Sequence, residues 1–142
     1  MKRLVLLFLM VGLTVLSAGC KKQAMTIQNA WAIPGSIGGN SAVYFTVNNA
    51  SSHGDQLLGG SASVAQTSEI QMAIKLTDGK QTILKQAAVP IPANKKILFE
   101  PDRLFLALNN LTQNLKAGDQ IALTLKFEKA GDITLSVKVK SP

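Results

Sequence analysis

The sequence predicts an all-β protein, built as a single antiparallel β-sandwich. Apolar and polar residues alternate in about seven or eight short runs, and turn residues separate these runs. No stretch shows a convincing helical period, and only residues 108–116 could hold one helical turn. Because alternation at period two places apolar side chains on one face, such strands pack as antiparallel sheets around a single core.

The first half of the chain contains four expected strands. Residues 42–48 are rich in β-branched and aromatic side chains, and a short apolar stretch follows at 56–59. Apolar residues alternate with others through 70–76, and an Asp-Gly pair at 78–79 leads into 81–86. An Asp-Gly pair between two alternating runs predicts a β-hairpin.

The second half contains four more expected strands. Two prolines mark an irregular crossing, after which residues 96–99 and 104–108 form short apolar runs. Residues 121–127 and 133–139 alternate regularly on either side of the Gly131-Asp132 turn. This regular alternation predicts that the last two strands have one buried and one solvated face.

The N-terminus carries the layout of a bacterial export signal. Lys2 and Arg3 precede an apolar run over 4–16, and the small residues at 17–19 precede Cys20. The run is shorter than the roughly 20 apolar residues that span a bilayer. The segment from Leu16 to Cys20 resembles a lipobox, which implies a lipid attached to Cys20. The alternative is an ordinary signal peptide whose cleavage site falls near a cysteine.

These features predict three segments. Residues 1–19 are the lipoprotein signal peptide, residues 20–28 are a lipidated N-terminus and linker, and residues 29–142 are one β-sandwich domain. We expect an exported lipoprotein that is anchored in a membrane and faces the periplasm or the cell exterior. The membrane is then one partner of the chain, through the N-terminal lipid.

The charge distribution argues against a nucleic-acid partner. Without Lys2 and Arg3, 13 of the 15 basic residues remain against 8 acidic ones, and they are spread along the chain. A nucleic-acid surface needs clustered basic residues interleaved with stacking aromatics. With one cysteine in the whole sequence, no disulfide can form within the chain, so burial must supply the stability.

Catalysis is not expected. The chain has one histidine, His53, and it lies in the polar turn 51–55. A Ser-His-Asp arrangement needs no adjacency in sequence, so a hydrolase is kept as a remote alternative. No glycine-rich phosphate loop precedes a helix.

Five segments resemble the periplasmic copper chaperone family called PCuAC, in the same order and over nearly the whole mature chain. They are residues 42–48, 55–59, 89–93, 111–119 and 123–131, the last containing Phe-Glu-Lys-Ala-Gly. The resemblance implies a cupredoxin-like or immunoglobulin-like sandwich. It also implies that relatives carry Cu(I) toward a cytochrome oxidase copper centre.

The copper ligands of that family are mostly missing. The resemblance implies one ligand, ten residues, Met, 21 residues, and then His-x-Met; these slots fall on Met72, Ile83, Phe105 and Ala107. Only Met72 has a donor atom, and Cu(I) needs several soft donors together. Met72 also fits an apolar strand face, where Met fills gaps. No cofactor is therefore expected, with Cu(I) kept open.

Two functional hypotheses remain beside the hydrolase. The first is a family member that has lost metal binding and acts as a non-catalytic binding or accessory protein, with a protein partner in copper or oxidase assembly. The second is a Cu(I) carrier for oxidase assembly that uses unorthodox donors such as Met72 and His53, with Met25 the remaining candidate. An exposed apolar patch around Phe105 and Met72 would favour the first hypothesis, because monomers rarely expose contiguous apolar surface.

Overall fold

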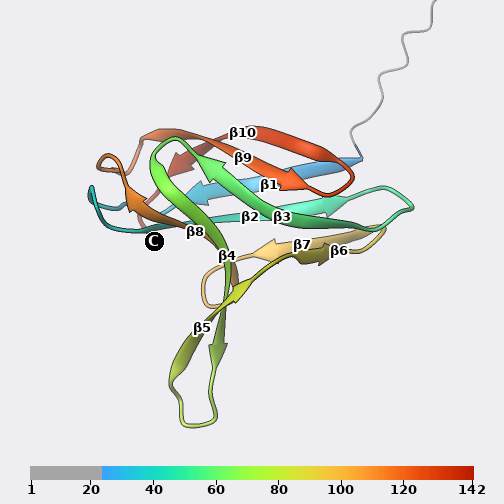
Figure 1. Cartoon of the computed structure of the whole chain (residues 1–142), viewed down its shortest axis with the longest axis horizontal. Helices are drawn as coiled ribbons and strands as arrows, with labels where there is room; N and C mark the ends of the chain where they lie inside the picture. The colour runs from blue at the N-terminus through green and yellow to red at the C-terminus, as the bar shows by residue number, and fades with distance from the viewer. Residues whose placement is uncertain (1–23) are drawn as a thin grey trace, which may run out of the picture.

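The computed structural model describes residues 24–142, and the expected signal peptide and Cys20 lie outside this part of the chain. Within it, no helix is long and apolar enough to cross a membrane. The described residues form ten strands and no helix (Figure 1). The strands are β1 (Met25–Ala32), β2 (Ser41–Asn49), β3 (Asp55–Ala62), β4 (Ala65–Lys75), β5 (Gln81–Gln86), β6 (Val89–Ile91), β7 (Lys95–Phe99), β8 (Leu104–Leu111), β9 (Gln120–Phe127) and β10 (Gly131–Val139).

The prediction of an all-β sandwich is confirmed. The strands are hydrogen-bonded in the order β5-β4-β8-β2-β1-β10-β9-β3-β6, and β7 pairs with β2. The sheet folds over on itself, so that β9 and β10 lie above β1 and β2 in Figure 1, and β3 crosses the view obliquely. The expected antiparallel pairing needs one correction, because the described β1 and β10 run parallel, with Trp31 opposite Lys138.

The core lies between the two layers and is entirely apolar at its centre. Each layer contributes the inward-facing half of its alternating strands, as the repeated buried–exposed pattern of β9 shows. Phe45 and Phe99 stack with ring centroids 4.3 Å apart. Each large apolar side chain removed from water contributes about 1.5–3 kcal/mol to stability. The largest fully buried side chains include Phe45, Phe127, Leu57, Leu106, Leu123 and Leu125.

Three local expectations need correction. β1 begins at Met25, whose side chain is buried, so the folded part starts four residues before the expected boundary at residue 29. The proline-containing crossing includes a short strand, β6, whose central Pro90 is exposed at the end of the strand order, where the missing N–H costs little. Residues 108–116 hold no helical turn, because β8 continues to Leu111 and Leu115 pairs with Gly35.

A β-bulge in β1 changes which side chains face outward. The β1–β2 register shifts between Gln28 and Trp31, and Asn29 in the bulge has a φ of 53°. One extra residue reverses the alternation of a strand. Before the bulge Met25 belongs to the core, and after it Ala32 does, so that Trp31 is directed away from the core.

Candidate functional site

Three of the four family slots lie on one outward face of β5, β4 and β8. Residues directly opposite each other in neighbouring strands project from the same face of a sheet. Here Ile83, Phe105 and Ala107 all oppose consecutive odd-numbered residues of β4. The pairs are Ala73 with Ile83, Gln71 with Phe105, and Glu69 with Ala107. We call this surface the slot face.

The fourth slot, Met72, lies on the opposite face. Met72 pairs with Leu84 on β5 and Leu104 on β8, and Leu104 packs against the core. Its side chain lines a pocket that also contains Lys96 and Arg103, two cations that would repel a metal ion. The structure therefore does not bring Met72 together with the other slots. The β4 residue that faces Phe105 is Gln71.

The residues of the slot face do not fit copper. Ile83, Phe105 and Ala107 have no donor atom, and the Gln71 amide oxygen is a hard ligand that suits Cu(I) poorly. Residues 24–142 contain no group of three or more His, Cys, Asp or Glu side chains that could hold a metal ion. We therefore derive no copper chemistry at this face.

An aromatic row borders the slot face and reaches it at Phe105. Trp31 opposes Tyr44 in the β1–β2 register, with ring centroids 4.7 Å apart, and the Tyr44 ring lies 6.4 Å from that of Phe105. All three rings are partly exposed, and Ile83 at the projecting β4–β5 hairpin is 48% exposed (Figure 1). The row Trp31–Tyr44–Phe105 thus crosses three strands and makes this surface apolar.

One ion pair lies on this face, with Glu69 opposite Ala107 and Lys85 opposite Gln71. Lys85 and Glu69 form an ion pair at 2.9 Å, and hydrogen bonds from Lys85 and then Gln71 lower the pKa of the Glu69 carboxyl. Burial, and secondarily the Asp102 carboxylate, raises the pKa of the Tyr44 phenol. The tyrosine is therefore neutral at physiological pH. The slot face therefore combines the apolar side chains of Ile83 and Phe105 with one ion pair.

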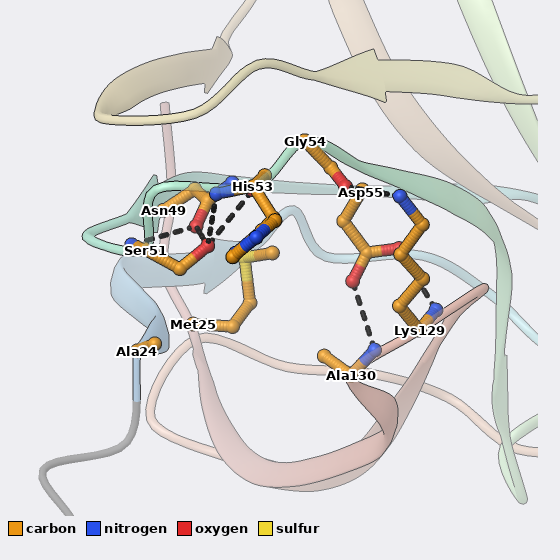
Figure 2. A pocket seen from close by; sticks show the side chains of 9 residues that line it. All are labelled: Ala24, Met25, Asn49, Ser51, His53, Gly54, Asp55, Lys129 and Ala130. Carbon is orange, nitrogen blue, oxygen red and sulfur yellow. Dashed lines mark hydrogen bonds between the residues drawn. The ribbon is translucent and has the colours of Figure 1, made fainter.

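His53 lies on the exposed β2–β3 loop, as expected, and lines a pocket with Met25 (Figure 2). Met72 lines a different pocket, so the structure separates the two donors, Met72 and His53, named for an unorthodox copper carrier. The sequence pointed to Met25 as a further donor but did not indicate its proximity to His53. That proximity depends on the loop conformation.

The hydrolase alternative gains no support from the geometry. Ser52 Oγ lies 3.1 Å from His53 Nδ1, but both side chains are exposed in the loop. The nearest acidic residue in sequence, Asp55, does not orient the imidazole. Its two oxygens instead accept backbone N–H groups of Gln56, Lys129 and Ala130.

Sequence reasoning missed the aromatic row and the role of Gln71. Tyr44 and Phe105 belong to strands that were expected, and their odd–even positions relative to buried neighbours could have placed both outward. Trp31 had no such signal, because strict alternation from Met25, without the bulge, would place the Trp31 side chain in the core.

The fold defines a β-sandwich of the PCuAC type. The chain belongs to the LpqE-like family: the family model described as "Putative lipoprotein LpqE-like" matches residues 25–139. No curated protein matches the chain. The resemblance to PCuAC proteins drawn from the sequence is confirmed.

Solved PCuAC domains have the same fold. The apo PCuAC domain from PmoF1 is 22% identical, with a TM-score of 0.72 over 84% of this chain and 95% of that one. The copper-bound PCuAC domain from PmoF2 is 20% identical, with a TM-score of 0.70 over 84% and 94%. The solution structure of apo-DR1885 from Deinococcus radiodurans is 24% identical, with a TM-score of 0.63 over 90% and 86%.

Proposed function

We propose that this protein is an extracytoplasmic lipoprotein that uses the PCuAC fold as a non-catalytic binding module. It docks a protein partner through the slot face, where its relatives would carry copper. The observation that carries the proposal is the aromatic row, which reaches the slot face at Phe105, a position where the resemblance implies a metal ligand. Anchoring at Cys20 is supported by the signal pattern and by the description of the family as lipoproteins.

The chemistry of the slot face suits a protein partner. Contiguous exposed apolar surface is uncommon on monomers and marks interaction sites. Tyr, Trp and Phe are enriched in interface centres, where they bury large areas with few rotatable bonds. The Glu69–Lys85 ion pair adds a polar contact point on the same face, with Lys85 67% exposed. The resemblance suggests a partner that works in copper or oxidase assembly.

Site-specific photo-crosslinking in cells that make the protein tests this function. A photoreactive amino acid replaces Ile83 on the slot face, and a matched chain carries it at Thr134, an exposed residue of β10. We expect one discrete adduct from position 83 and none of that size from position 134. Adding Phe105→Lys should abolish the adduct while thermal unfolding shows the chain still folded.

Two outcomes contradict docking at the slot face. One is the absence of any adduct from position 83 under conditions where the chain is exported and folded. The other is the same adduct from positions 83 and 134, which would indicate contact without a preferred face.

A further inference from the structure

Four chain segments meet at one end of the sandwich. They are the start of β1, the β2–β3 loop, the β6–β7 loop with the start of β7, and the β9–β10 turn (Figure 1). Met25 at the start of β1 opposes Asn49, which in turn opposes Lys95 at the start of β7. Adjacent strands lie about 4.8 Å apart, so the backbone of Lys95 is about 10 Å from that of Met25. We call these four segments the β1 end.

Asn49 holds the loops of the β1 end in place. Its side chain is 1% exposed, and its Nδ2 donates to the carbonyl oxygens of His53 at 2.8 Å and Pro92 at 3.2 Å. The backbone N–H of Asn94 also donates to the Ser51 carbonyl at 3.0 Å. These bonds join the β2–β3 loop to the β6–β7 loop, so the β1 end presents its side chains as one surface.

Three exposed lysines lie at the β1 end. Lys95 and Lys96 begin β7, and Lys129 lies in the β9–β10 turn. Lys129 Nζ donates to the Gly54 carbonyl at 2.7 Å, and its side chain lines the same pocket as Ala24, the first described residue (Figure 2). In the described part of the chain, none of the three lysines takes part in an ion pair. Their charges are therefore available to a surface outside the chain.

The acidic groups of the β1 end do not cancel this charge. Asp55 is 8% exposed, and its oxygens accept three backbone N–H groups. Asp132 opposes Lys126 in the β9–β10 hairpin, so these two charges balance each other. Glu128 is exposed and accepts a hydrogen bond from Gln56. The exposed surface of the β1 end is therefore positive.

The sequence limits how far the β1 end can lie from a lipid on Cys20. Residues 20–23 precede Ala24, and an extended chain spans at most about 3.6 Å for each residue, so Cys20 lies within about 15 Å of Ala24. Lys21 and Lys22 add two more basic residues to this stretch of sequence. The potential of an anionic bilayer decays over a Debye length of about 8 Å at physiological salt. A lipid-anchored chain can therefore bring the β1 end into this layer.

We propose that the β1 end rests on anionic phospholipid headgroups, which Lys95, Lys96 and Lys129 contact. Lysine ammonium groups form charge-assisted hydrogen bonds with phosphate oxygens. The inference rests on the anchoring at Cys20 that is part of the proposed function, and it adds an orientation to that anchor. The β1 end faces the bilayer, and the opposite end, roughly 25 Å away along the eight residues of β3, faces the solvent.

Fluorescence quenching by lipid headgroups tests this orientation. The lipidated chain receives a fluorophore on a new cysteine at the exposed Ser52 in the β2–β3 loop. A matched chain carries it at the exposed Ser63 in the β3–β4 turn, at the opposite end. Both chains are reconstituted in phosphatidylcholine vesicles with a headgroup quencher, with or without phosphatidylglycerol. We expect quenching at position 52 to rise with phosphatidylglycerol and fall with added salt, with little change at position 63.

Two matched sets of charge variants test the lysines. The first set neutralises the β1 end with Lys95→Gln, Lys96→Gln and Lys129→Gln. The second set removes the same charge from exposed positions at the opposite end: Lys116→Gln, Lys138→Gln and Lys140→Gln. Each lysine near an anionic surface contributes about fivefold to the docking equilibrium, so the first set should weaken docking on the order of a hundredfold. The second set should retain the quenching at position 52.

Thermal unfolding checks that both variant chains are folded, and the lipid and salt dependence of the parent chain tests the inference without any charge variant. The inference is overturned if quenching at position 52 is the same in both kinds of vesicle, if both label positions are quenched equally, or if the two variant sets behave alike. A chain that floats with neither kind of vesicle would overturn the anchor together with this inference. Crosslinking from position 83 reports on docking at the slot face alone.

Discussion

Asp55 shows how one side chain holds the end of the sandwich together. Its carboxylate is 8% exposed and accepts backbone N–H groups of Gln56 at 2.7 Å, Lys129 at 2.9 Å and Ala130 at 2.8 Å. Burial alone would raise the pKa of this carboxyl. The three N–H donors and the Lys129 charge outweigh that effect, so the pKa of Asp55 lies below its ordinary value. The carboxylate thereby joins the start of β3 to the β9–β10 turn.

We expect Asp55→Asn to lower the free energy of unfolding by about 1–3 kcal/mol at pH 7, since a charged acceptor and part of its bonding are lost. A lowered native pKa stabilises the fold above the unfolded pKa of about 3.9, and this stabilisation is lost as the pH falls through the native value. The difference in the free energy of unfolding between the parent chain and Asp55→Asn should therefore shrink below about pH 4.

Urea unfolding at pH 7 and pH 3 measures this difference, with the exposed Asp132→Asn as the control. A difference that stays the same at both pH values would mean that ionised Asp55 is not what stabilises the turn.

The β1 bulge decides which face carries the only tryptophan of the chain. Asn29 occupies the left-handed region at φ 53°, which Asn tolerates and β-branched residues do not. Asn29→Val should cost about 1–2 kcal/mol of unfolding free energy, the penalty for an L-residue held in that region. Asn29→Gly should leave stability almost unchanged.

Thermal and urea unfolding followed by Trp31 fluorescence measure these effects together. Gln28→Val, an exposed position in the same strand, is the matched control. Equal stabilities for the Val variants at 28 and 29 would show that the bulge does not impose the positive φ.

The strands with strict alternation were predicted well. The runs 121–127 and 133–139 correspond to β9 and β10, and the Asp-Gly pair does close the β4–β5 hairpin. Each of these strands has one buried face, and this produces an alternation of apolar and polar residues that is visible in the sequence. β6 was missed because its Pro90 is a strand breaker anywhere except at an edge.

The resemblance assigned four slots by their spacing, and the structure places Ile83, Phe105 and Ala107 on one face of the sheet and Met72 on the other. A shift of one residue turns a side chain to the other face of a sheet, and only the observed pairing shows that Gln71 faces Phe105. The same holds for Met25 and His53, which meet through a loop whose shape depends on Asn49.

At the scale of the whole molecule, the residues that form the core differ from those that form the slot face. The core uses the inward residues of β8, such as Leu106, whereas Phe105 and Ala107 belong to the other face, where Phe105 is partly exposed and Ala107 is 5% exposed. Metal ligands can therefore be exchanged for apolar side chains without touching the core. This separation explains how the chain retains the fold of PCuAC domains, with TM-scores near 0.7, while its slot face has no donors.

The central proposal is that the slot face keeps three of the four PCuAC positions and has lost their ligands. Restoring donors tests it most directly: Gln71→His, Ile83→Met, Phe105→His and Ala107→Met are combined in a chain that also carries Cys20→Ser and His53→Ala. A matched chain has Met72→His in place of Gln71→His, and Cu(I) affinity is measured against a chelator. We predict one tightly held Cu(I) in the first chain and much weaker binding in the second. Failure of the first chain to gain Cu(I), or equal binding by both, would contradict the claim.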